Sequence, residues 1–112
     1  MPRPLTLLRG TLDVLVLRAL AWRPMHGFEI TAWLDERGKG NLELLDSALY
    51  QALYRLEERR LIAAEWGMTD NNRRARYYSL TPAGRAHLRA ETANWMRYAA
   101  TVTAILAEPR TA

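Results

Sequence analysis

The sequence predicts a mostly α-helical domain that carries one small β-hairpin and ends in a long helix. Apolar residues recur at helical spacing in four separate stretches of the chain. Two short runs, Ile62 to Trp66 and Arg76 to Leu80, are typical of strands, and the polar, turn-forming segment "GMTDNNRRA" lies between them. The 112 residues are enough for one compact domain with its own core, and too few for two.

The first two helices should form much of the core. The first is expected from about Leu7 to Ala21, and its apolar residues lie almost all round it, which predicts burial on two sides. Arg23-Pro24 ends it. The second helix begins near His26-Gly27 and ends by Gly38 or Gly40. Its inward-facing residues should be Ile30, Trp33 and Leu34.

The third helix lies in "LDSALYQALYRLEERRLI", from Leu45 to Ile62, and has two different faces. One face is a narrow stripe of leucines, at positions Leu45, Leu49, Leu53 and Leu56. The other face carries groups that can stack or form hydrogen bonds, namely Ser47, Tyr50, Gln51, Tyr54 and Arg55. Asp46 or Ser47 can cap the N-terminus. Since solvated helices usually carry Glu and Lys, this polar face, at about residues 47–60, predicts a surface that recognises a ligand.

The hairpin should place Ile62, Ala64 and Trp66 inward and expose its tip, at about residues 67–76. Trp22, Trp33 and Trp66 are expected in the core. The tip gathers polar and basic side chains in one protrusion: Asn71, Asn72, Arg73, Arg74 and Arg76. An ordinary solvated turn is the alternative interpretation of this cluster.

The last helix should begin at Thr81-Pro82, with Thr as N-cap and Pro in the first helical position, and run to about Ala107. Apolar and small residues follow a heptad spacing along it: Leu88, Thr92, Trp95, Ala99, Val102 and Leu106. One small domain offers little surface for so long a helix. A second protomer is therefore expected along this seam, chiefly at Leu88, Trp95, Val102 and Leu106.

Composition narrows the class of protein. The formal net charge of +4 favours a polyanionic partner, but Lys39 is the only lysine, and an arginine bias also arises in GC-rich genomes. No apolar run reaches the roughly 18 residues that a membrane span needs. The segment Leu5 to Leu20 is not followed by a cleavage site, which disfavours a signal peptide. The absence of cysteine permits a reducing compartment, so a cytoplasmic protein is expected.

Catalysis and metal binding are both disfavoured. The chain has no cysteine, no phosphate-binding glycine motif and no histidine beside a nucleophile, so we expect neither an enzyme nor a cofactor. His26 and His87 have no nearby carboxylate cluster, so no metal site is expected.

Three helices followed by a hairpin with a basic tip form the order of a winged helix-turn-helix, a fold suited to double-stranded DNA. The third helix is narrow enough for the major groove, where Gln51 suits an adenine edge and Arg55 a guanine or a phosphate. Tyrosine hydroxyls suit phosphate oxygens, although Tyr50 alternatively packs at the rim of the core. The basic tip suits phosphates or the minor groove alongside. His26 and Gly27, at the start of the second helix, present backbone N–H groups to one more phosphate.

Two segments, "SALYQALYRLEERRLI" and "NNRRARYYSLTPAGR", resemble the PadR family of transcriptional regulators. Its hallmarks are an "LYxxLxRLE" recognition helix and a "YYxLTxxG" junction, and the resemblance extends from Leu8 and "HGFEI" through the last helix. It implies a homodimeric repressor with a DNA-binding domain at 1–81 and a dimerisation helix and tail at 82–112. The two protomers would be joined through their C-terminal and N-terminal helices. Some members bind planar aromatic compounds at the dimer centre. Trp95 could stack on such an effector, or fill that space itself as an interface anchor.

Two positions depart from the family pattern. Relatives often have Pro at the position of Gln51, so Gln51 could add a base contact special to this chain. Relatives usually have Gly at the position of Arg60, a site after the helix that favours a positive φ. The alternative function is a protein–protein interaction module, in which the heptad seam binds a different partner and the wing is incidental.

Overall fold

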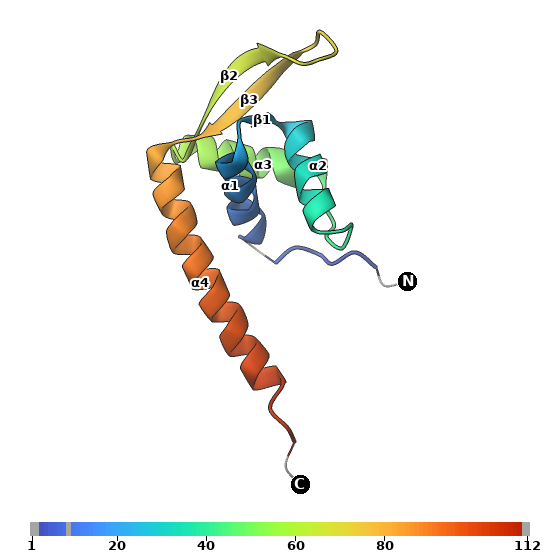
Figure 1. The fold of residues 1–112 in the computed structure, drawn as a ribbon, viewed down its shortest axis with the longest axis vertical. Helices are drawn as coiled ribbons and strands as arrows, with labels where there is room; N and C mark the ends of the chain where they lie inside the picture. The colour runs from blue at the N-terminus through green and yellow to red at the C-terminus, as the bar shows by residue number, and fades with distance from the viewer. Residues whose placement is uncertain (1–2, 9, 111–112) are drawn as a thin grey trace.

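The structure is a computed structural model that describes residues 3–8 and 10–110. Its elements are α1 (Thr11–Trp22), β1 (Met25–His26), α2 (Gly27–Arg37), α3 (Asp46–Glu58), β2 (Ile62–Met68), β3 (Arg74–Leu80) and α4 (Pro82–Leu106). Helices α1, α2 and α3 form the body, and the hairpin β2–β3 projects from one end; α4 begins beside the base of the hairpin and runs past the body to extend beyond its other end (Figure 1). The molecule is therefore elongated, with extents of 64 × 35 × 20 Å. The predicted fold class, mostly α with a small hairpin and a long last helix, is confirmed.

Helix α1 is the centre of the core. It contacts α2, α3, α4 and β3, which confirms its predicted burial on more than one side. The largest fully buried side chains come from α1, α2, α3, the start of β2 and the strand β1: Val16, Leu17, Met25, Ile30, Leu53, Leu56 and Ile62. Burial of about 25 cal/mol per Å2 of apolar surface makes this cluster the main source of stability.

The start of α1 differs from the prediction. The helix begins at Thr11 rather than near Leu7, because Gly10 has φ 84 and cannot belong to a right-handed helix. Upstream, Leu5 bridges to Leu42, so this segment lies along the loop between α2 and α3. Arg9, which the prediction includes in the helix, lies outside the described residues.

The sheet has one strand more than the sequence predicts. Strands β2 and β3 pair antiparallel from Ile62↔Leu80 to Met68↔Arg74, which confirms the hairpin and lengthens it. Strand β1 adds a third strand by pairing with β3. Its two residues are too few to produce a periodic pattern. Through this pairing, the start of α2 is attached to the hairpin of β2 and β3, which is called the wing below.

Two tryptophans are not in the core. Trp66 is 61% exposed and Trp22 is 67% exposed, so the prediction of core positions is wrong for both, while Trp33 is partly buried. The guanidinium of Arg74 lies 4.6 Å from the ring centroid of Trp66. Arg37 lies 4.0 Å from the Trp33 ring and 6.0 Å from the Trp22 ring. These cation–π contacts cover indole faces at the surface, which a hydropathy pattern does not reveal.

The N-terminus of α3 also differs from the prediction. The N-cap is Leu45, so neither Asp46 nor Ser47 caps the helix. Both lie in its first turn, where the negative charge of Asp46 interacts favourably with the helix dipole. Leu45 is 54% exposed and therefore does not belong to the buried stripe, which begins at Leu49.

The C-terminus of α3 is a Schellman motif. Arg60 N–H donates to the Glu57 carbonyl (2.9 Å), Leu61 N–H donates to the Leu56 carbonyl (3.0 Å), and Arg60 has φ 59. The left-handed conformation expected at Arg60 is therefore present.

Replacing Arg60 with glycine is expected to keep or raise the free energy of unfolding, by up to about 1 kcal/mol, because the relieved left-handed strain offsets or exceeds the freedom that glycine adds to the unfolded chain. The melting temperature, measured by circular dichroism, should stay the same or rise by up to roughly 4–8 °C. Arg59→Gly is the matched control, because Arg59 has φ −81 and glycine there only loosens the unfolded chain. A lower melting temperature for Arg60→Gly would contradict the prediction.

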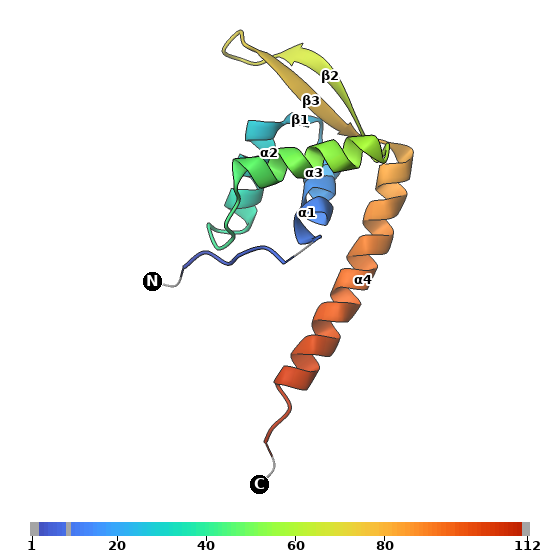
Figure 2. The ribbon, with the colours of Figure 1, turned by 180° about the vertical axis from the view of Figure 1, so that it is seen from behind.

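Helix α4 begins as predicted. The Oγ1 of Thr81 accepts a hydrogen bond from Gly84 N–H at 3.0 Å, and Pro82 occupies the first helical position. The helix contacts α1, and Leu88 in its second turn is buried. Toward its C-terminal end α4 extends away from the body (Figure 2). Several of its large apolar residues are exposed: Trp95, Met96, Tyr98, Ile105 and Leu106. Among the described residues, no helix is both long and apolar enough to cross a membrane.

Candidate nucleic-acid interface

The outward face of α3 carries every polar residue that the sequence assigned to it. Ser47, Tyr50, Gln51, Tyr54 and Arg55 are all exposed. The opposite face of α3 packs into the core through Leu49, Ala52, Leu53 and Leu56. The polar side chains therefore project from a helix whose position is fixed by burial.

Tyr50 both packs against the protein and remains accessible. Its hydroxyl lies so near Gly27 that a Cβ on Gly27 would come within 2.6 Å of it, yet Tyr50 is 54% exposed. The phenol ring thus rests against the first residue of α2. A Cβ on residue 27 would displace the ring from this contact, which joins the start of α2 to α3 on one side of the molecule.

The N-terminus of α2 is capped by neighbouring side chains. The Nδ1 of His26 accepts from Glu29 N–H (3.3 Å), and Glu29 Oε1 accepts from His26 N–H (3.1 Å), which forms a capping box. Arg23 donates a further hydrogen bond to the Glu29 carboxylate at 3.3 Å. The sequence predicts a phosphate near His26 and Gly27, but the capping carboxylate disfavours an additional anion there.

The tip of the hairpin is a defined turn. Thr69 N–H donates to the Arg73 carbonyl (2.8 Å), and Asn72 N–H donates to the Thr69 carbonyl (2.9 Å). Asn72 has φ 61, a conformation that asparagine tolerates better than most residues. The side chains that the sequence places at the tip are all exposed, namely Asn71, Asn72, Arg73, Arg74 and Arg76, but Arg76 lies within β3 and not in the turn.

Two of the predicted DNA-contacting arginines are held by carboxylates of the same chain. Arg55 binds Asp13 of α1 through Nη2–Oδ1 (2.6 Å) and Nε–Oδ2 (3.4 Å). Arg76 binds Glu57 of α3 through Nη1–Oε1 (2.9 Å) and Nη2–Oε2 (2.8 Å). Hydrogen bonds to these carboxylates raise the pKa of both guanidinium groups above their ordinary value. In the part of the chain that the structure describes, Arg73 and Arg74 form no such ion pair.

A groove of about 880 Å3 brings the separate parts of this surface together. Its lining includes Tyr50 of α3, Phe28 of α2, and Trp66, Arg73 and Arg74 of the wing. Phe28 is 78% exposed and was not among the site residues predicted from the sequence. Its position off the inward stripe of α2 is the signal that could have identified it.

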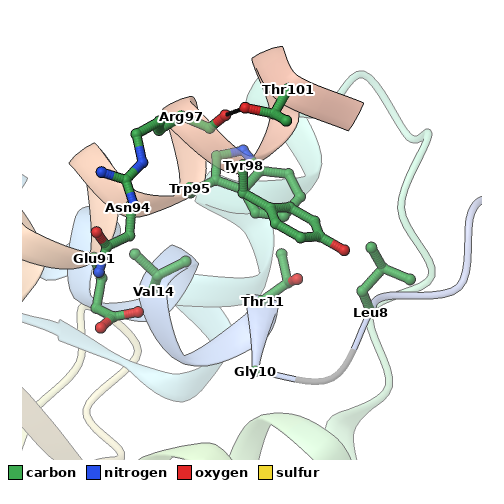
Figure 3. Close-up of a pocket in the computed structure, with 10 residues that line it drawn as sticks. All are labelled: Leu8, Gly10, Thr11, Val14, Glu91, Asn94, Trp95, Arg97, Tyr98 and Thr101. Atoms are coloured by element: carbon green, nitrogen blue, oxygen red, sulfur yellow. Dashed lines mark hydrogen bonds between the residues drawn. The ribbon is translucent and has the colours of Figure 1, made fainter. Parts of the chain in front are cut away.

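A second pocket, of about 700 Å3, lies between α4 and the start of α1 (Figure 3). Its aromatic wall is formed by Trp95 and Tyr98, with ring centroids 6.1 Å apart, and Leu8 and Val14 lie across from them. Of the other predicted seam residues, Leu88 is used in the protomer's own core, Val102 is partly buried and Leu106 is 80% exposed.

Helix α3 has a buried apolar face and an exposed polar face, and it lies beside a hairpin with a basic tip. This arrangement defines the class of protein as a winged helix-turn-helix, DNA-binding regulator. The profile of the Transcriptional regulator PadR-like family matches residues 16–90, and the chain belongs to that family. The resemblance predicted from the recognition-helix and junction motifs is therefore confirmed.

Two solved structures of PadR family regulators agree with this assignment, and one further relative is similar in sequence. A PadR family transcriptional regulator from Eggerthella lenta is 31% identical, covers 90% of this chain and 86% of its own, and superposes with a TM-score of 0.76. A PadR family transcription regulator from Clostridium difficile is 26% identical, with 87% of this chain and 99% of its own covered and a TM-score of 0.75. An uncharacterized protein from Lysinibacillus sphaericus is 28% identical over 89 residues, which is 80% of this chain and 82% of that protein.

Proposed function

We propose that the chain is a homodimeric, sequence-specific repressor that places α3 in the major groove and the wing along the adjacent backbone. The observation that carries this proposal is the groove in which α3, the start of α2 and the arginine tip share one side of the molecule. One duplex can then contact both the recognition helix and the wing. Membership of a family of transcriptional regulators favours this function over a protein–protein interaction module.

The exposed side chains divide into two roles. Gln51, Ser47 and Tyr54 project from the solvent face of α3 and suit base edges or nearby phosphate oxygens. Arg73 and Arg74, with Asn71 and Asn72, suit phosphates beside the groove. Exposed guanidinium groups that bind phosphates release the counterions condensed on the DNA, which favours binding. Arg55 and Arg76 should contribute less to DNA binding, since each already binds a carboxylate of the same chain.

Homodimerisation is proposed through α4, with the start of α1 alongside. Support comes from the exposed apolar residues on the part of α4 that extends beyond the body. A dimer would present two copies of α3 to an operator of approximate two-fold symmetry, with half-sites about one helical turn apart.

A planar aromatic effector is proposed for the pocket beside Trp95. The support is the aromatic wall of Trp95 and Tyr98 next to the proposed dimer surface. The alternative is that Trp95, which is 38% exposed, fills this space with its own ring as an interface anchor. Titration of tryptophan emission with planar aromatic compounds separates the two.

DNA binding is tested by fluorescence anisotropy on a fragment of the gene's own upstream region and on random DNA, over a range of salt concentrations. The double variant Arg73→Ala/Arg74→Ala should weaken both DNAs similarly and lower the slope of log K against log salt by about 2, as expected for two lost phosphate contacts. Gln51→Ala should keep the slope and lose discrimination by about 1–3 kcal/mol. Equal losses on both DNAs for both variants would contradict this division of roles, and salt-independent binding would contradict the proposed function.

A further inference from the structure

An ion pair between Glu57 and Arg76 links the recognition helix to the wing. Glu57 lies in the last turn of α3, and Arg76 lies in β3, 19 residues further along the chain. The two hydrogen bonds, of 2.9 and 2.8 Å, are nearly equal in length, as in a fork-to-fork guanidinium–carboxylate pair. Both side chains are partly exposed, at 31% for Glu57 and 43% for Arg76, so the pair is formed at the surface.

Arg76 lies at the point where the hairpin leaves the body. The base of the hairpin is held to the body through the pairing of β1 with Tyr77 and Tyr78 of β3. Arg76 is the next residue toward the tip, opposite Trp66, where β3 no longer has β1 beside it. Beyond this point the hairpin projects from the body (Figure 1). A bidentate pair fixes both the separation and the relative plane of its groups, so it restrains the hairpin where the sheet no longer does.

We propose that Glu57 is a positioning residue for DNA binding: it holds Arg76, and so presents Arg73 and Arg74 at a fixed angle to the outward face of α3. Arg76 then binds a carboxylate of its own chain rather than a DNA phosphate. This inference rests on the proposed DNA-binding function. Its physical basis is preorganisation, because a wing that is already oriented loses less freedom when it binds.

Electrostatics and positioning predict opposite results for Glu57→Gln. Removing a carboxylate from a DNA-binding surface should by charge alone strengthen binding to a polyanion. Loss of the wing's orientation should instead weaken operator binding roughly twofold to tenfold, the scale of ordering one or a few groups. Glu58→Gln is the matched control, since Glu58 is exposed on the same turn and forms no ion pair among the described residues. It should bind as tightly as the parent chain or more tightly.

Two further measurements make the test decisive. In the charge-swapped variant Glu57→Arg/Arg76→Glu the pair can re-form, so operator affinity should return to within about threefold of the parent, a difference on the scale of one exposed ion pair. Hydrogen exchange of the free protein should be faster in residues 66–76 of Glu57→Gln than in the parent, while the melting temperature stays close to it. This readout does not depend on DNA, so it tests the restraint even if the proposed function fails.

The inference is overturned if Glu57→Gln binds as tightly as Glu58→Gln, or if exchange in the wing is unchanged. It is also overturned if the charge-swapped variant binds as poorly as a variant that lacks the arginine, Arg76→Ala, because Arg76 would then contact phosphate directly. A parent chain that binds no DNA would count against the proposed function instead.

Discussion

Replacing Val102 and Leu106 with aspartate is expected to convert the proposed dimer to a monomer and to lower operator affinity by about a thousandfold, the lower end of the usual gap between specific and non-specific binding. Leu106 is 80% exposed and Val102 is partly buried, on a part of α4 that extends away from its own body. An aspartate at either position would have to be buried in the seam without a partner, which strongly disfavours assembly. A monomer would contact one half-site and lose the linkage between the two.

Light scattering would report the mass of the variant, and anisotropy with operator DNA its affinity. The control is Ala104→Asp, because Ala104 is exposed and lies on the opposite side of α4 from Val102 and Leu106. It adds one of the same negative charges without entering the seam, so it should remain a dimer and bind nearly as well. A double variant that stayed dimeric with full affinity would show that protomers do not associate along this face.

Replacing Gly84 with alanine is expected to lower the free energy of unfolding by about 3 kcal/mol, the upper part of the range for overpacking. Gly84 is buried in the first turn of α4, and a Cβ there would overlap the carbonyl oxygen and carbon of Leu61. That carbonyl cannot move easily, because it accepts a hydrogen bond from Thr81 N–H at 3.1 Å. The Thr81 Oγ1 also donates to the Arg60 carbonyl at 2.8 Å. The whole junction between α3, the hairpin and α4 would therefore have to shift.

Urea denaturation measures this loss. Gly40→Ala is the control, because Gly40 has φ 71 and a Cβ added there would meet no atom within 4 Å, so only about 1 kcal/mol of backbone strain is expected. The comparison separates a steric overlap from the general effect of replacing a glycine. If Gly84→Ala lost less stability than Gly40→Ala, the close approach to Leu61 would not be real.

Much of the fold could be predicted because its signals are local. The leucines of α3 and the apolar surface of α1 follow helical spacing, and hydrogen bonds between near neighbours define both helices. Thr81-Pro82 marked the start of α4 correctly, since a cap depends on a few consecutive residues. Arg60 has the expected positive φ for the same reason, because the end of a helix sets its own backbone geometry.

The errors have physical causes that lie outside such windows. Strand β1 has two residues and exists only because β3 lies beside it. The start of α1 was placed too early, since apolar spacing continued through a glycine that has left the helix. Trp22 and Trp66 were expected in the core, but arginines cover their faces at the surface. Burial was therefore inferred from residue type where a cation–π contact made exposure tolerable.

For the candidate site, the amino-acid order was sufficient to select the outward face of α3 and the basic hairpin tip. It could not show which arginines of this site bind carboxylates of the same chain. Arg55 finds Asp13 at a distance of 42 residues along the chain, and Arg76 finds Glu57 at 19. Such pairs form only when packing brings elements that are distant in sequence close enough for donor and acceptor atoms to lie about 3 Å apart, the range of a charge-assisted hydrogen bond. Tertiary structure therefore decided that Arg55 and Arg76 bind carboxylates of their own chain, while Arg73 and Arg74 form no ion pair among the described residues.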